Sequence, residues 1–152
     1  MSSFSFLYLK SGETMRSAIF VGIVVLLAIC IGCRGHERLI VEDDFLEHFI
    51  TSLEEQGLKV EPMEPSTSID MQGKVPFQMS ISQNGEDHDT VFVYFFNSAN
   101  QAKQALEQAS FTITSLTKID KYQKNNVIVI HYALDGNLGK YDSHIYEAMN
   151  TD

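Results

Sequence analysis

The sequence has little of several residue types that define other classes of protein. It contains two cysteines among 152 residues and no tryptophan. Two cysteines are too few for the disulfide-linked scaffold of small secreted domains. Lys and Arg number 11 against 20 Asp and Glu, which gives a formal net charge of −9. Because phosphate contacts need a basic surface, this balance argues against a nucleic-acid-binding protein.

The common catalytic motifs are missing as well. The sequence has no G-x-S-x-G, no G-x-x-x-x-G-K-[ST] and no G-x-G-x-x-G, and its five histidines show no H-E-x-x-H spacing. We therefore expect no catalytic residues, no metal site and no cofactor. Acid–base catalysis by carboxylates that meet only in the folded chain stays open, because such pairs leave no local pattern.

An apolar segment near the start of the chain is the strongest feature that is present. Residues 18–31 carry no charge, Arg16 precedes them, and Gly32-Cys33 follows. A basic residue, an apolar run and a small residue in this order are typical of a secretory signal peptide. The run is shorter than the roughly 20 residues of a membrane span. An uncleaved single span with the same domain outside is the alternative.

The end of this segment resembles the type II signal peptide of bacterial lipoproteins. In that family a small residue precedes a cysteine that receives a diacylglycerol thioether, and Gly32 and Cys33 match these positions. Cys30 stands where the family usually has Leu, and Ile31 is bulkier than usual. A frame that ends at Cys30 is disfavoured because Ile29 takes the small-residue position. The resemblance implies lipid attachment at Cys33, and two or more acyl chains give stable membrane anchoring.

These features divide the chain into three parts. Residues 1–32 are expected to be the signal peptide, with translation starting either at Met1 or at Met15. Residues 33–43 form a lipidated tether, and residues 44–152 form one domain. Loss of the leader makes the mature chain more acidic. An anionic lipid surface would repel such a domain.

Three short segments have spacings that suggest metal or redox chemistry, and each has a simpler explanation. Cys30 and Cys33 form a C-x-x-C pair, but the pair lies in an apolar segment without a second one. Residues 86–89 hold three carboxylates and an imidazole, yet neighbouring residues of a hairpin tip do not all point at one ion. Residues 135–139 resemble the start of an EF-hand loop but lack two of its ligands. We expect two polar turns and no metal.

The periodicity of apolar residues predicts an α+β domain. Helices are expected over residues 44–57, 98–109 and 141–149, and strands over residues 58–60, 77–82, 90–96, 118–123 and 127–133. The order α-β-β-β-α-β-β-α predicts a two-layer sandwich, a mostly antiparallel sheet with helices on one face. Asp44 with Glu47 is expected to cap the first helix, and Asn97 or Ser98 the second. The chain has a strand, an Asn97-Ser98 cap and an alanine-rich helix, followed later by Lys124-Asn125-Asn126-Val127 and an apolar strand that reaches Tyr132. This pattern resembles small lipoproteins of bacilli, a general likeness that implies no activity.

The histidines and aromatic residues of the domain have two interpretations each. His131 lies within an expected strand, where a hydrogen-bonded histidine at the sheet face is favoured over a catalytic base. His144 lies on the last helix and is expected to face solvent. Alternate residues of one strand form an aromatic row, Phe92, Tyr94 and Phe96. One interpretation is that this row lines a ligand groove. The interpretation that we favour is that it packs in the core against Phe45, Phe49 and Leu106.

The sequence therefore predicts a lipid-anchored protein at the extracytoplasmic face of the cell membrane. We expect a non-enzymatic module, acylated at Cys33, that binds or modulates a protein or an envelope ligand. The alternatives are a single-pass membrane protein with the same domain and, less favoured, a cell-envelope hydrolase.

Overall fold

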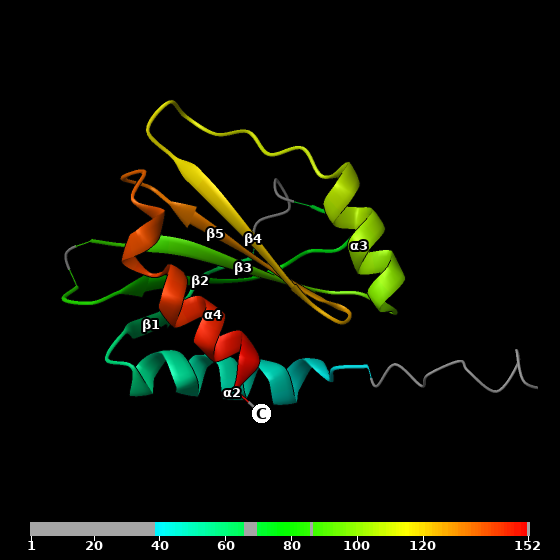
Figure 1. The fold of residues 1–152 in the computed structure, drawn as a ribbon, viewed down its shortest axis with the longest axis horizontal. Helices are drawn as coiled ribbons and strands as arrows, with labels where there is room; N and C mark the ends of the chain where they lie inside the picture. The colour runs from blue at the N-terminus through cyan, green and yellow to red at the C-terminus, as the bar shows by residue number, and fades with distance from the viewer. Residues whose placement is uncertain (1–38, 66–69, 86, 152) are drawn as a thin grey trace, which may run out of the picture. The chain divides into compact units, whose positions relative to one another are not determined.

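A five-stranded antiparallel sheet is the centre of the fold. The computed structural model describes residues 39–65, 70–85 and 87–151 (Figure 1). The predictions for the leader, for the start at Met15 and for lipid attachment at Cys33 lie outside these residues. Among the described helices, none is both long enough and apolar enough to cross a membrane.

The elements follow the predicted order. The strands are β1 (Lys59–Pro62), β2 (Phe77–Ser82), β3 (Asp89–Phe95), β4 (Lys118–Lys124) and β5 (Val127–Ala133). The helices are α2 (Glu42–Glu55), α3 (Ala99–Gln108), α4 (Asp142–Asn150) and the short 3₁₀ helix η2 (Leu138–Lys140). The sheet order is β1-β2-β3-β5-β4, and every neighbouring pair is antiparallel. The α+β class and the order α-β-β-β-α-β-β-α are confirmed.

Helices cover both faces of the sheet, which corrects the prediction of helices on one face. Val91 and Val93 of β3 pack with α2 and α4, whereas Phe92 and Tyr94 pack with α3. Successive side chains of a strand point to opposite faces. In Figure 1, α3 lies on the side of the sheet away from α2 and α4. The arrangement has three layers, because a central strand that is apolar on both faces needs cover on each.

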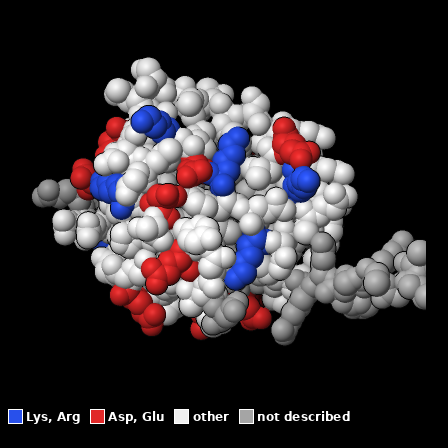
Figure 2. Space-filling model, viewed as in Figure 1, with Lys and Arg blue, Asp and Glu red and all other residues white. Residues whose placement is uncertain are grey.

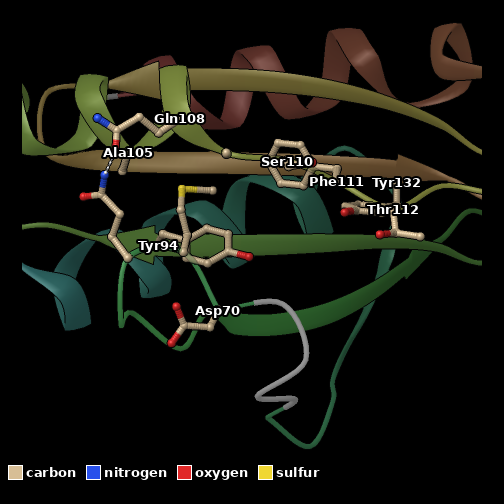
Figure 3. A pocket seen from close by; sticks show the side chains of 11 residues that line it. Asp70, Tyr94, Ala105, Gln108, Ser110, Phe111, Thr112 and Tyr132 are labelled. Carbon is tan, nitrogen blue, oxygen red and sulfur yellow. Dashed lines mark hydrogen bonds between the residues drawn. The ribbon is translucent and has the colours of Figure 1, made fainter.

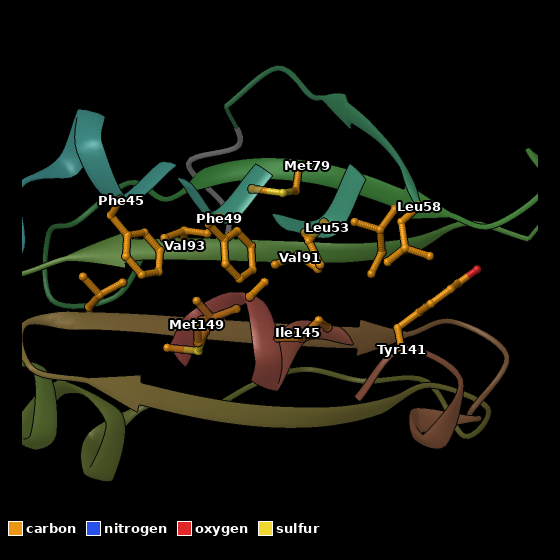
Figure 4. Close-up of a cluster of buried hydrophobic side chains, with 14 residues drawn as sticks. Phe45, Phe49, Leu53, Leu58, Met79, Val91, Val93, Tyr141, Ile145 and Met149 are labelled. Atoms are coloured by element: carbon orange, nitrogen blue, oxygen red, sulfur yellow. The ribbon is translucent and has the colours of Figure 1, made fainter. Parts of the chain in front are cut away.

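The face under α2 and α4 carries the larger apolar cluster (Figure 4). Side chains of α2 and α4 meet there over β2, β3 and β5. Its best-buried members include Phe49, Leu53, Met79, Val91, Val93 and Ile145. Phe45 stacks on Phe49 with ring centroids 5.5 Å apart. As predicted, α4 faces inward through Ile145 and Met149.

α2 begins earlier than predicted and without the predicted cap. It starts at Glu42, Val41 occupies the N-cap position, and no side chain caps the helix. Asp44 lies in the first turn, where a carboxylate interacts favourably with the helix dipole. Asn126 holds the preceding chain, since its Oδ1 accepts a hydrogen bond from the amide of Ile40 at 2.7 Å. A contact from 86 residues away therefore holds the backbone directly before α2.

The start of α3 confirms the second predicted cap. The Oγ of Ser98 accepts a hydrogen bond from the amide of Gln101 at 3.1 Å, and the Gln101 side chain accepts one from the amide of Asn97. Ala102 and Ala105 face the sheet and are fully buried. Their small side chains let α3 lie close to the sheet.

Candidate functional site

A cavity of about 350 Å³ lies between α3 and the sheet (Figure 3). This volume is at the lower end of the range for ligand sites, about 300–1,000 Å³. Three aromatic side chains line it: Tyr94 from β3, Tyr132 from β5 and Phe111 from the segment after α3. The size and the aromatic lining suit a small organic molecule.

Polar and small side chains complete the lining. The polar residues are Asp70, Gln72, Gln108, Ser110 and Thr112, and the apolar ones are Met71, Ala105 and Ala109. Figure 3 shows Asp70 on one side of Tyr94 and the α3 residues on the other. The site is therefore built from separate segments, none of which forms a motif by itself.

The aromatic rings are held firmly in place. Phe92 contacts Tyr132 edge-to-face with ring centroids 5.0 Å apart, and Phe111 contacts the same ring at 6.3 Å. Edge-to-face pairs of this kind contribute about 0.5–1.5 kcal/mol beyond their burial. Tyr94 is almost fully buried. Little reorganisation is expected when a ligand enters between these rings.

A tight turn forms the wall opposite α3. Backbone hydrogen bonds join Met71 and Lys74 in both directions at 3.1 Å. Gln72 and Gly73 between them both have positive φ, 52° and 77°. Two positive φ angles are the pattern of a type I′ turn, in which glutamine is less favoured than Gly, Asn or Asp. The buried side chain of Met71 fixes the turn to the core under α3.

Two side-chain hydrogen bonds stiffen this wall. The Oδ1 of Asp70 accepts from the amide of Gly73 at 2.7 Å, so the carboxylate keeps a fixed direction. The Nε2 of Gln72 donates to Oε1 of Gln108 at 2.9 Å, which joins the turn to α3 beside the cavity (Figure 3). The side-chain amides of Gln72 and Gln108 are thus hydrogen-bonded to each other, and the Asp70 carboxylate lines the cavity.

The cavity is electron-rich. Burial raises the pKa of both Tyr94 and Tyr132, and for Tyr94 the neighbouring Tyr132 and the Asp70 carboxylate raise the pKa further. Both phenols therefore remain protonated at neutral pH. Among the described residues that line the cavity, none is Lys or Arg. Asp70 is thus the charged group among the described lining residues.

A second polar cluster, Asp89 with His131, lies on the other face of the sheet. The Nε2 of His131 is 3.0 Å from Oδ2 of Asp89, and the two side chains are 0% and 2% exposed. Oδ1 of Asp89 accepts from the amide of Leu134 at 3.1 Å. A carboxylate only accepts hydrogen bonds, so Nε2 of His131 is the donor. This pair links β3, β5 and the turn that follows β5.

Aromatic side chains cover this pair. The ring of Tyr141 contacts His131 edge-to-face, and His144 contacts Tyr141 in the same way. The hydroxyl of Tyr141 donates to the carbonyl of Asp87 and accepts from the amide of Gln83. Neither the cavity under α3 nor the small hollow beside Tyr141 is lined by His131. The predicted hydrogen-bonded histidine at a sheet face describes His131 correctly.

The residues of the acidic hairpin tip take separate partners. Asp87 pairs with Lys140 at 3.2 Å, His88 is 3.1 Å from Oγ of Ser80, and Asp89 points inward to His131. Glu86 lies outside the described residues. In the part of the chain that is described, no three His, Cys, Asp or Glu side chains are placed to hold a metal ion.

The second expected turn, residues 135–139, leads into η2. The Oδ1 of Asp135 accepts from the amide of Asn137 at 2.8 Å, and Oδ2 lies 3.9 Å from Lys140. The carboxylate therefore has local partners of the kind found in turns.

The prediction of which residues pack against the aromatic row Phe92, Tyr94 and Phe96 is partly wrong. Tyr94 lines the cavity, whereas Phe92 and Phe96 are buried in the apolar cluster beneath α3, against which Leu106 packs. Phe45 and Phe49 belong to the cluster on the opposite face. The sequence offered no sign of Asp70 or Phe111 as lining residues, because both lie in irregular segments without periodicity.

Charges are interspersed on the surface. On the face shown in Figure 2, basic side chains stand apart from each other with acidic ones between them. This face lacks the continuous basic surface that phosphate backbones require. Its surface charge does not point to a large anionic ligand.

Comparisons with protein-family models, with curated proteins and with solved structures find no significant match for this chain. The assignment of function therefore depends on the site itself.

Proposed function

We propose that the chain is a lipid-anchored extracytoplasmic binding module, and that its ligand occupies the cavity between α3 and the sheet. The cavity is the observation that carries this proposal. It combines three aromatic rings with a few directed polar groups, which is the composition of small-molecule sites. The segment that ends in Gly32-Cys33 supports the anchored location.

Binding is favoured over catalysis by the position of the histidines. A general base has to come within hydrogen-bond distance of its substrate, about 2.6–3.2 Å. His131 is fully buried and hydrogen-bonded to Asp89, on the face of the sheet opposite the cavity. The described lining residues offer phenols, amides, hydroxyls and one carboxylate, groups that can orient a ligand, and no base–nucleophile pair is evident among them.

Filling the cavity should abolish ligand binding. Ser110 lines the cavity and is exposed, so Ser110→Trp adds a large ring there without overpacking the core. Ser115→Trp is the matched control, because Ser115 is an exposed serine of the same loop that does not line the cavity. The measurement is the ¹³C-methyl resonance of Met71 in the full chain, titrated with a mixed set of small amines, acids, alcohols and aromatics.

We expect at least one compound to shift the Met71 resonance in the unchanged chain and in Ser115→Trp but not in Ser110→Trp. Absence of any shift in the unchanged chain would contradict the proposed function. So would a shift that persists in Ser110→Trp.

Lipid attachment should depend on Cys33. With Cys33→Ala we expect complete loss of labelling by a palmitate analogue, while Cys30→Ala keeps the label, because Cys30 is removed with the leader. Mass spectrometry of the purified chain gives the independent readout. An intact leader without lipid would instead support the single-pass alternative, and retained labelling in Cys33→Ala would reject this attachment site.

A further inference from the structure

We infer that the cavity binds a small organic cation, a molecule that carries an ammonium group. This inference rests on the proposed function, since it names the ligand class of the same site. It follows from the combination of aromatic rings, one carboxylate and the composition of the remaining lining.

The aromatic residues provide the first part of the argument. Cations are attracted to the faces of aromatic rings within about 6 Å, and aromatic pockets are a common way to bind ammonium groups. Tyr94, Phe111 and Tyr132 contribute three rings to one cavity. Phe111 already accepts a cation within the molecule, because Nζ of Lys121 lies 4.6 Å from its ring centroid. Lys121 lines the neighbouring hollow and not this cavity.

The charge of the lining provides the second part. Asp70 is the charged residue among the described lining residues, and its side chain is fixed by the hydrogen bond to Gly73. An anionic ligand would be repelled by this carboxylate, whereas a cation would be attracted to it. An ammonium group satisfies the carboxylate and the rings together.

The two phenol oxygens complete the site. Tyr94 and Tyr132 line the same cavity as Asp70, so the site includes two phenol groups besides the carboxylate. The net charge of the chain, −9, also favours the approach of cations over anions. The aromatic rings, the carboxylate and the net charge all favour a cationic ligand over an anionic one.

The test uses two probes of the same shape and different charge. Choline carries a quaternary ammonium group, and 3,3-dimethylbutan-1-ol replaces the charged nitrogen by carbon. The full chain, purified in a neutral detergent, is titrated with each probe while the ¹³C-methyl resonance of Met71 is followed. We expect choline to bind at least about tenfold more tightly than the neutral alcohol.

Substitution of the carboxylate is the second arm. In Asp70→Asn the side-chain oxygen can still accept from the amide of Gly73, so the turn is retained while the charge is lost. Glu47→Gln is the matched control, because Glu47 is an exposed carboxylate on α2, on the other face of the sheet. We expect the affinity for choline to fall about tenfold in Asp70→Asn and to change less than twofold in Glu47→Gln.

The outcomes separate the two proposals. Equal binding of both probes, abolished by Ser110→Trp, would overturn the inference of a cation and leave the proposed function standing. The same holds if only acids or neutral compounds shift Met71. An equal loss of choline affinity in Asp70→Asn and Glu47→Gln would also overturn it, because the effect would then come from net charge alone. If no compound of any class shifts Met71, the proposed function itself fails.

Discussion

Asp89→Ala will lower the free energy of unfolding by about 3–5 kcal/mol, measured by urea denaturation followed by circular dichroism. The side chain of His131 is fully buried, and Asp89 is its hydrogen-bond partner at 3.0 Å. The substitution leaves the imidazole without this partner and also removes the acceptor of the Leu134 amide. Unsatisfied buried polar groups cost their full desolvation penalty.

A double-mutant cycle distinguishes a broken pair from a simple loss of packing. His131→Leu alone leaves a buried carboxylate, whereas Asp89→Ala with His131→Leu leaves an apolar site. We therefore expect the double variant to lose less stability than the sum of the two single variants.

Asp135→Ala is the control, since Asp135 is an exposed carboxylate near the same end of β5. It should change the free energy of unfolding by no more than about 0.5 kcal/mol. Strict additivity in the cycle, or a loss below about 1 kcal/mol for Asp89→Ala, would contradict the assignment of a buried hydrogen-bonded pair.

The strands illustrate what local sequence determines. Alternation in residues 77–82 and the apolar runs at 90–96 and 127–133 gave β2, β3 and β5 nearly to the residue. The Asn125-Asn126 turn also gave the β4–β5 hairpin. These features depend on side-chain period and turn chemistry, which neighbouring residues supply.

Side-chain period and turn chemistry did not predict which face of the sheet each helix covers. An apolar stripe on a helix fits either face, so periodicity does not tell which face it covers. The apolar character of both faces of residues 90–96 already required cover on each, and the Val91 and Phe92 sides of β3 meet different helices. Phe45 and Phe49 were consequently expected beside aromatic residues that lie on the other face.

The candidate site was less predictable than the fold because its parts are far apart in the sequence. For the aromatic row that contains Tyr94, the sequence left two roles open, a ligand groove or core packing. Asp70 and Phe111 lie in irregular segments, and their approach to Tyr132 depends on the placement of α3 and of the Met71–Lys74 turn. Likewise, Asp89 and His131 are 42 residues apart and meet only across β3 and β5.

Asn126→Ala will lower the free energy of unfolding by about 2–4 kcal/mol and will free the start of α2. Asn126 is 3% exposed. Its Oδ1 accepts from the amide of Ile40, and its Nδ2 donates to the carbonyls of Ile40 and Phe96, at 2.7, 3.1 and 3.0 Å. The substitution leaves three backbone groups without these partners, two of them at the entrance to α2.

Hydrogen exchange at the first turn of α2 is the specific readout. In the unchanged chain, the Asn126 side chain holds the segment that leads into the domain, so the amides near Ile40 should exchange slowly. In Asn126→Ala they should exchange faster by more than the global loss of stability explains. Asn125→Gly is the control, because Asn125 is exposed and has φ of 52°, which glycine adopts readily. Uniform acceleration over the whole domain would show that Asn126 stabilises the fold without specifically holding α2, and the chain entering the domain would then be joined to it by α2 packing alone.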